Sequence, residues 1–204
     1  MVIKVKGAQQ FFVLLMASLL LFGCAATGPG TGDTGEKADD QAKTGVDPKA
    51  SAAFESALAA MKAGNNAQAE KQLLQLTQDF PAFSGPHVNL GILYFREGSK
   101  EKARAAFKRA LELNPKSAVS LNHLGIMSRS EGRFKEAYSY YEKALQAAPD
   151  YAYAHRNLGI LLDLYMGKLE EALEHYKRYQ ELTEEEDQEV KKWIVDLERR
   201  VKKG

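Results

Sequence analysis

The sequence predicts an all-α fold, a solenoid of short paired helices that repeat along the chain. Three observations support this prediction: residues recur at a fixed period, apolar residues follow helical spacing inside each period, and glycine or proline ends each helical stretch. The recurrence appears in five ladders with a common step of 34 residues. The ladders are Pro81, Pro115 and Pro149; Gly91, Gly125 and Gly159; Gly64, Gly98 and Gly132; Ala69, Ala103 and Ala137; and Leu90, Leu124 and Leu158.

Each period contains the pattern of two helices. In the unit that starts at residue 84, apolar residues at helical spacing run to Gly98, which is a suitable C-terminal cap. The second stretch, residues 100–113, is amphipathic and ends before Pro115, because proline cannot continue a helix. Glycine in the first helix and alanine in the second let the backbones approach closely, and a large side chain such as Phe107 fills the remaining space.

The order of small, aromatic and proline residues is the same in successive units. One unit carries His87, Leu90, Gly91, Tyr94, Gly98, Ala103, Phe107, Ala110 and Pro115. The next carries Leu121, Leu124, Gly125, Gly132, Ala137, Tyr141, Ala144 and Pro149, with Ser128 in the tyrosine position. This pattern resembles the tetratricopeptide repeat. The resemblance implies a right-handed superhelix of helix pairs, whose first helices line a concave face that binds peptides or helices of other proteins.

The resemblance divides the body of the chain, residues 50–183, into about four units. These are 50–83, 84–117, 118–151 and 152–183. The fourth has one extra residue before Gly167, which predicts a longer turn or a local bulge in its first helix. Residues 184–204 are predicted to form a C-terminal capping helix, because a repeat array otherwise exposes its last stacking surface. Thr183 and Glu186 fit a capping box at the start of this helix.

The first 23 residues have the pattern of a secretory signal, with a basic stretch followed by an uncharged apolar run over residues 11–23. The apolar run has 13 residues, whereas a helix that spans a bilayer needs about 20. It ends in Leu21-Phe22-Gly23-Cys24, which resembles the bacterial lipobox. The resemblance implies cleavage before Cys24, a diacylglyceryl group on its thiol and an acyl chain such as palmitate on the new amine. The alternative is an ordinary signal followed by an incidental cysteine.

Residues 24–49 are predicted to be a flexible tether behind the lipid. Small and polar residues dominate this stretch, so it cannot bury enough apolar surface to fold. Its root-mean-square reach is about 25–30 Å. Ala25 follows the cysteine where aspartate would mark retention. In a bacterium with two membranes this implies a lipid anchor in the outer membrane, with the body facing the periplasm. In a Gram-positive cell the same signal implies the outer side of the plasma membrane.

Alignment of the four units with one another predicts a peptide-binding groove along the first helix of each unit. Its apolar ladder is Leu58, Ile92, Ile126 and Ile160. Its flanks vary between units: Phe54, Val88, Asn122 and Arg156 on one side, and Met61, Phe95, Arg129 and Asp163 on the other. Asn89 and Asn157 occupy the position at which the resembling family often binds the ligand backbone. An apolar strip between changing polar walls suits a peptide better than a small metabolite. The alternative is that the ladder is partly core and the walls are merely solvated.

Several other functions lack a signal in the sequence. No nucleophile elbow, phosphate-binding glycine loop or H-E-x-x-H motif occurs, so no catalytic residue is predicted and the chain is not expected to be an enzyme. The net charge is +1 and no basic stripe is present, which argues against nucleic acid. No two histidines have the helical spacing of a metal site, so neither a metal nor any cofactor beyond the covalent lipid on Cys24 is expected.

The sequence therefore predicts a scaffold of the cell envelope that recruits or pilots another envelope protein and takes no small-molecule substrate. It is held on the membrane by its lipid. The alternative is a structural lipoprotein that self-associates as a homo-oligomer through a tyrosine-rich stripe on an outer helix, formed by Tyr138, Tyr140 and Tyr141.

Overall fold

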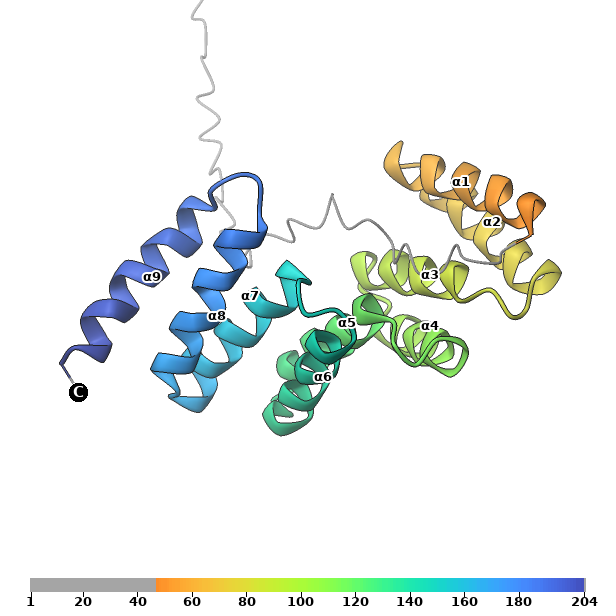
Figure 1. Cartoon of the computed structure of the whole chain (residues 1–204). Helices are drawn as coiled ribbons and strands as arrows, with labels where there is room; N and C mark the ends of the chain where they lie inside the picture. Colours follow the sequence, from red (N-terminus) through yellow and green to blue (C-terminus); the bar gives the residue numbers. More distant parts are fainter. Residues whose placement is uncertain (1–46, 204) are drawn as a thin grey trace, which may run out of the picture. The chain divides into compact units, whose positions relative to one another are not determined.

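A computed structural model describes residues 47–203, and this part of the chain is built from helices without a β-strand (Figure 1). The helices are α1 (Pro48–Lys62), α2 (Asn66–Asp79), α3 (Ser84–Arg96), α4 (Lys100–Leu113), α5 (Ala118–Ser130), α6 (Phe134–Ala147), α7 (Ala152–Leu161), the π-helix η2 (Leu162–Met166), α8 (Leu169–Leu182) and α9 (Gln188–Val201). The predicted all-α fold is confirmed. Within the described range, no helix combines the length and the apolar character that crossing a bilayer would require. Residues 1–46, with the predicted signal, Cys24 and most of the tether, lie outside the described residues.

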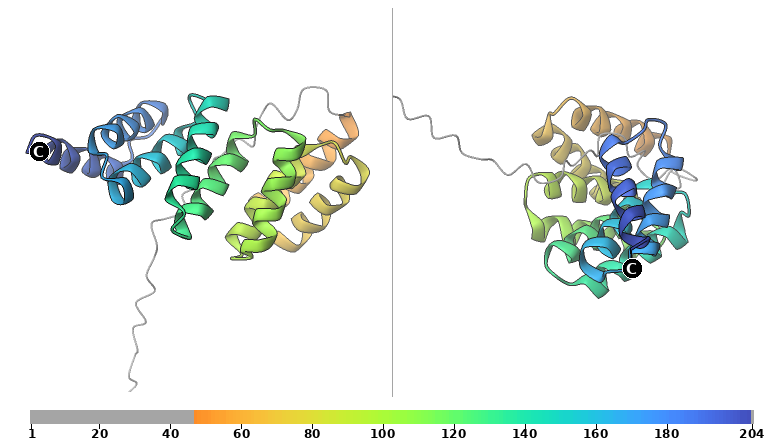
Figure 2. Two further views of the ribbon diagram at one scale, coloured as in Figure 1. Left: turned by 90° about the horizontal axis from the view of Figure 1, so that it is seen from below. Right: turned by 90° about the vertical axis from the view of Figure 1, so that its left-hand side faces the viewer.

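The helices pack as successive pairs, α1 with α2, α3 with α4, α5 with α6, and α7 with α8. Each second helix also packs against the first helix of the next pair, as the views in Figure 2 show. The first helices α1, α3, α5 and α7 contact one another in turn, whereas no contact of similar extent joins the second helices of the described pairs. The first helices therefore lie closer together and form one continuous surface, here called the inner face.

The two helices of a pair are held at a short distance by a glycine that faces an aromatic ring. A Cβ atom on Gly91 would lie 2.5 Å from Phe107, and one on Gly125 would lie 2.5 Å from Tyr141. Gly159 has the same relation to Tyr176, at 2.7 Å. All three rings are buried, so they cannot move aside. The predicted role of these glycines in close helix packing is confirmed.

The turn between the two helices of a pair is also the same in successive units. Gly98 and Gly132 both have a φ of 75°, a left-handed conformation that favours glycine. At the first of these turns the amide of Gly98 donates to the carbonyl of Phe95, and the amide of Ser99 donates to that of Tyr94. This pair of bonds is the Schellman motif, which satisfies the last carbonyls of the helix.

The fourth unit departs from this regular turn, as its extra residue predicts. The end of its first helix is wound as the π-helix η2, and the chain reverses at Gly167 with a φ of 66°. The amide of Lys168 donates to the carbonyl of Leu162, which closes the wider turn. The predicted bulge is therefore present.

The C-terminal helix α9 packs on α8 and buries Val190 and Leu197. The prediction that a capping box at Thr183 starts this helix is wrong. The N-cap is Asp187, whose carboxylate accepts from the amides of Glu189 (3.0 Å) and Val190 (3.1 Å). Thr183 instead ends α8, where its hydroxyl donates to the carbonyl of Tyr179. Residues 184–186 form a loop between the two helices. Asp187, three residues before the buried Val190, is the better-placed cap, because its carboxylate reaches the first free amides of α9.

At the other end of the array, α1 starts at Pro48, two residues before residue 50, where the first unit was predicted to begin. Asp47 caps the helix, with its carboxylate accepting from the amide of Lys49 at 2.7 Å. Pro48 occupies the first turn, where a missing amide hydrogen has no consequence.

One contact between α7 and α8 joins two histidines that are far apart in sequence. Nδ1 of His155 lies 2.9 Å from Nδ1 of His175, and Nε2 of His155 lies 2.9 Å from the carbonyl oxygen of Pro149. If Nε2 of His155 donates to that carbonyl, its Nδ1 accepts from Nδ1 of His175. Burial, together with the neighbouring His155, lowers the pKa of His175 from 6.5 to about 4, against the opposing effect of Glu171.

Replacement of Gly125 by alanine is expected to destabilise the fold by about 2–3 kcal/mol, because the new methyl group overlaps the buried Tyr141 ring. Gly132→Ala is the matched control: nothing lies within 4 Å of its Cβ, so only the left-handed conformation is penalised, by about 1 kcal/mol. Urea unfolding followed by circular dichroism measures both changes. Adding Tyr141→Leu to Gly125→Ala should cost less than the sum of the two single changes; strict additivity would contradict the proposed overlap.

The histidine pair predicts a loss of stability in acid. The unfolded chain protonates His175 near pH 6.5, whereas the folded chain does so only near pH 4. The contribution of neutral His175 to the free energy of unfolding is therefore complete above pH 6.5. It decreases by about 2–3 kcal/mol as the pH falls towards 4. Urea unfolding at pH 7.5, 6, 5 and 4 should show a steeper decline for the wild type than for His175→Gln. Equal declines would contradict the prediction.

Candidate functional site

The predicted apolar ladder lies on the inner face, but its members differ in exposure. Ile92 is only 5% exposed and belongs to the core between α1, α3 and α5. Leu58, Ile126 and Ile160 are partly buried and pack against the core from the surface. The ladder is therefore partly core, and Ile92 is not available to a ligand.

One predicted flank of the groove is part of the packing between neighbouring first helices. Phe54, Val88 and Asn122 are all buried. The ring of Phe54 contacts that of Phe83 edge to face, with 4.9 Å between centroids. These side chains face the next helix of the array instead of solvent, so the prediction that they form a groove wall is not supported by their positions.

The two asparagines that the alignment assigned to ligand binding are used within the protein. Asn89 is buried, and its side-chain amide donates to the carbonyl of Gly85 at 3.0 Å. Asn157 is also buried, and its amide donates to the side-chain oxygen of Asn122 at 3.0 Å, across the contact between α5 and α7. A buried amide without a partner is costly, so these bonds hold the side chains inside.

The opposite flank is more accessible. Met61 and Phe95 are partly buried, and the Phe95 ring contacts the His123 ring edge to face at 5.4 Å. Arg129 is also partly buried, and its guanidinium donates to the backbone carbonyl of Asn157 at 3.3 Å. In the described part of the chain, no carboxylate forms an ion pair with Arg129.

The last two predicted wall residues, Arg156 and Asp163, contact the capping helix α9. The guanidinium of Arg156 lies 5.7 Å from the centre of the Trp193 ring and 4.0 Å from the carboxylate of Glu189. Asp163 is nearly buried and lies 2.8 Å from the guanidinium of Arg200. Both residues therefore attach α9 to the first helix of the fourth unit, Arg156 from α7 and Asp163 from η2. The sequence alignment did not reveal this role, because the partner residues lie outside the repeats.

The accessible groups consequently lie towards α1, α3 and α5. They are Leu58, Met61, Phe95, Ile126 and Arg129, with Ile160 at the edge of α9. This set, here called the inner-face strip, offers apolar contact surface and one arginine, Arg129, that has no carboxylate partner among residues 47–203. An arginine in such a position can bind a carboxylate or a backbone carbonyl of a partner.

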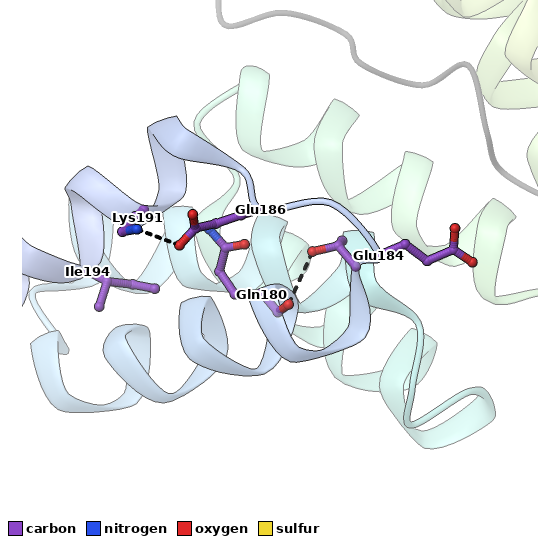
Figure 3. A pocket seen from close by; sticks show the side chains of 6 residues that line it. Gln180, Glu184, Glu186, Lys191 and Ile194 are labelled. Carbon is purple, nitrogen blue, oxygen red and sulfur yellow. Dashed lines mark hydrogen bonds and ion pairs between the residues drawn. The ribbon is translucent and has the colours of Figure 1, made fainter.

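The surface hollows of the described residues lie away from the inner-face strip. One of about 370 Å³ lies between the end of α8 and the start of α9, where Glu186 and Lys191 form an ion pair of 2.7 Å (Figure 3). Another, of about 340 Å³, is lined by apolar and acidic residues around Phe80 and Phe83. No predicted groove residue lines either hollow.

The described residues provide no group of three or more side chains that could hold a metal ion. His155 and His175 approach each other closely, but they supply only two ligands, fewer than protein zinc sites use. Sequence spacing did not reveal this pair, because the two residues lie on different helices.

Comparison with known families identifies the repeat. One family model described as a tetratricopeptide repeat matches residues 54–118, and a second with the same description matches residues 116–185. A search of curated proteins finds no match.

Solved structures with the same arrangement of helices include PilF from Pseudomonas aeruginosa, with 24% identity and a TM-score of 0.66 over 76% of this chain and 69% of that chain. MamA from Desulfovibrio magneticus RS-1 has 20% identity and a TM-score of 0.61, over 76% of this chain and 87% of that chain. At this level of identity the similarity concerns the fold. The body of this chain, residues 54–185, is an array of tetratricopeptide repeats.

Proposed function

We propose that this protein is a membrane-anchored scaffold of the bacterial cell envelope, which binds a peptide or helix of a partner protein on its inner face. The observation that carries the proposal is the inner-face strip, in which partly exposed apolar side chains of α1, α3 and α5 share one face with Arg129 of α5. A fold of this class is suited to protein–protein contact, and the strip supplies a place for it.

The form of the strip favours an extended or helical segment as its ligand. Leu58, Phe95 and Ile126 come from α1, α3 and α5, so one small molecule could not contact them all, whereas a peptide running across the helices could. Arg129, at the far end of the strip, would bind a carbonyl or carboxylate of that peptide. We place the binding region over α1–α5, since α9 is attached beside α7.

The proposed anchor is the lipid on Cys24, and its support comes from the sequence. Cys24 is the only cysteine of the chain and directly follows the apolar run of the signal. Each acyl CH₂ group that enters the bilayer contributes about 0.8 kcal/mol, so two or three acyl chains give stable attachment. In a bacterium with two membranes we place the body in the periplasm, below the outer membrane.

The alternative, self-association through the tyrosine stripe of α6, is less well supported. Tyr141 is buried against Gly125, Tyr138 is partly buried against the same core, and Tyr140 is partly buried against the cores of the neighbouring helices. Tyr141, which fills the space inside its helix pair, therefore cannot contact a second copy, and Tyr138 and Tyr140 expose only part of their surface.

Ile126→Asp is expected to reduce capture of the partner about tenfold or more, because it places a charge in the centre of the apolar strip. Leu74→Asp is the matched control, since Leu74 is an exposed leucine on α2, outside the strip. Formaldehyde crosslinking of the full chain in its own envelope, followed by mass spectrometry, measures capture.

Circular dichroism must show equal helical content in the two variants. Because Ile126 is partly buried, Arg129→Gln provides a second test that leaves the core intact, with a loss of about threefold or more expected from one charged hydrogen bond. Capture that is unchanged in both Ile126→Asp and Arg129→Gln would show that the strip is not the binding site.

Cys24→Ser is expected to move the protein from the membrane fraction to the soluble fraction, because serine cannot receive the thioether-linked lipid. Cell fractionation and labelling with radioactive palmitate measure the change. Retention of the variant in salt-washed membranes, or palmitate incorporation equal to that of the wild type, would refute the lipid anchor.

A further inference from the structure

The fourth unit carries a histidine on each of its two helices, at positions that face each other. The glycine–aromatic contact aligns the units: His155 lies four residues before Gly159, and His175 directly precedes Tyr176. The equivalent residues are His87 and Ala106 in the second unit and Leu121 and Tyr140 in the third. Among the three units that share this contact, the fourth alone has histidine at both positions, so the other two serve as internal controls.

The two rings meet edge to edge, with their nitrogen atoms in contact. Nδ1 of His155 lies 2.9 Å from Nδ1 of His175, and the ring planes are inclined at 41° with 5.1 Å between centroids. A tetrahedral zinc ion with Zn–N bonds of about 2.0–2.1 Å holds two nitrogens about 3.3 Å apart. An additional separation of roughly 0.4 Å therefore admits an ion bonded to both nitrogens. His175 then carries its ring proton on Nε2 in place of Nδ1, so no proton is released.

The orientation of the His155 ring is fixed by the backbone. Its Nε2 lies 2.9 Å from the carbonyl oxygen of Pro149. Donation from Nε2 to this carbonyl leaves the lone pair of Nδ1 directed at His175. Histidines that bind metal ions have the same arrangement, because a carbonyl or carboxylate on the second nitrogen fixes the tautomer that the metal requires.

Two imidazoles are fewer ligands than a zinc ion takes, and Glu171 is placed to supply a third. It lies one turn before His175 on α8, and residues four apart share one face of a helix. Its carboxylate is near enough to raise the pKa of His175, against the effect of burial. In the structure this carboxylate pairs with Lys168 at 2.9 Å, and both side chains are nearly half exposed. An exposed ion pair contributes little to stability, so the carboxylate can turn to a metal ion at small cost.

We propose that His155, His175 and Glu171 bind a zinc ion that joins α7 to α8, with water as the fourth ligand. Imidazole nitrogen together with one carboxylate suits zinc, whereas Mg²⁺ and Ca²⁺ take oxygen ligands. The ion binds the folded chain and therefore stabilises the irregular fourth unit. The site is separate from the inner-face strip and requires neither the proposed peptide ligand nor the lipid.

The test is calorimetric titration of the full chain with zinc chloride at pH 7.5, after purification in detergent and removal of metal with EDTA. One ion per chain should bind. His155→Ala and His175→Ala should each weaken binding at least about 100-fold, and Glu171→Gln about tenfold. His87→Ala is the matched control, because His87 occupies the place of His155 in the second unit. It should bind zinc as the wild type does, and so should Cys24→Ser, which removes the single thiol of the chain.

X-ray absorption of the zinc-loaded wild type identifies the ligands without any substitution. The spectrum should contain two imidazole nitrogens at about 2.0–2.1 Å. Circular dichroism must show equal helical content in the variants. The proposal is overturned by a spectrum without imidazole, by the absence of stoichiometric binding, or by unchanged affinity in His155→Ala or His175→Ala. It is also overturned if His87→Ala or Cys24→Ser weakens binding as much as His175→Ala does, and unchanged affinity in Glu171→Gln would contradict the assignment of the third ligand.

Discussion

The contact between a glycine of the first helix and an aromatic ring of the second determines the rest of this structure. At Gly91, Gly125 and Gly159 there is no room for a Cβ atom, so the helices of each pair approach more closely than ordinary side chains would allow. The buried rings of Phe107, Tyr141 and Tyr176 then fill the space beside the glycine. Because this distance is repeated in three pairs, each pair presents a similar surface to the next, and the pairs can stack.

Stacking of the helix pairs forms the inner face and also buries part of it between neighbouring first helices. Side chains such as Val88 and Asn122 are buried where one first helix meets the next, and the bond from Asn157 to Asn122 joins two units through their side chains. At the C-terminal end, Arg156 and Asp163 attach α9. The surface left for a partner is the strip between these contacts. The array thus uses the same face for its own cohesion and for the binding that we propose.

The fourth unit shows how a repeat can acquire a local feature without disturbing the array. One extra residue is absorbed as a π-helix, Gly167 restores the turn, and Gly159 still packs against Tyr176. Leu164 and Tyr165 of this irregular turn are exposed. Such a position is free to vary, because the packing of the pair does not depend on it.

The sequence by itself determined the repeat, the helix pairs, the glycine–aromatic contacts, the bulge before Gly167 and the presence of a terminal helix. These features depend on residues close in the chain or one period apart, where spacing corresponds directly to position in space. Only the tertiary structure decided that Asp187 caps α9, that Ile92 and Asn89 are buried, and that His155 meets His175. Whether a side chain faces solvent or a neighbouring helix depends on the angle and distance between packed helices. That geometry arises from the sum of many contacts, so spacing along one helix cannot specify it.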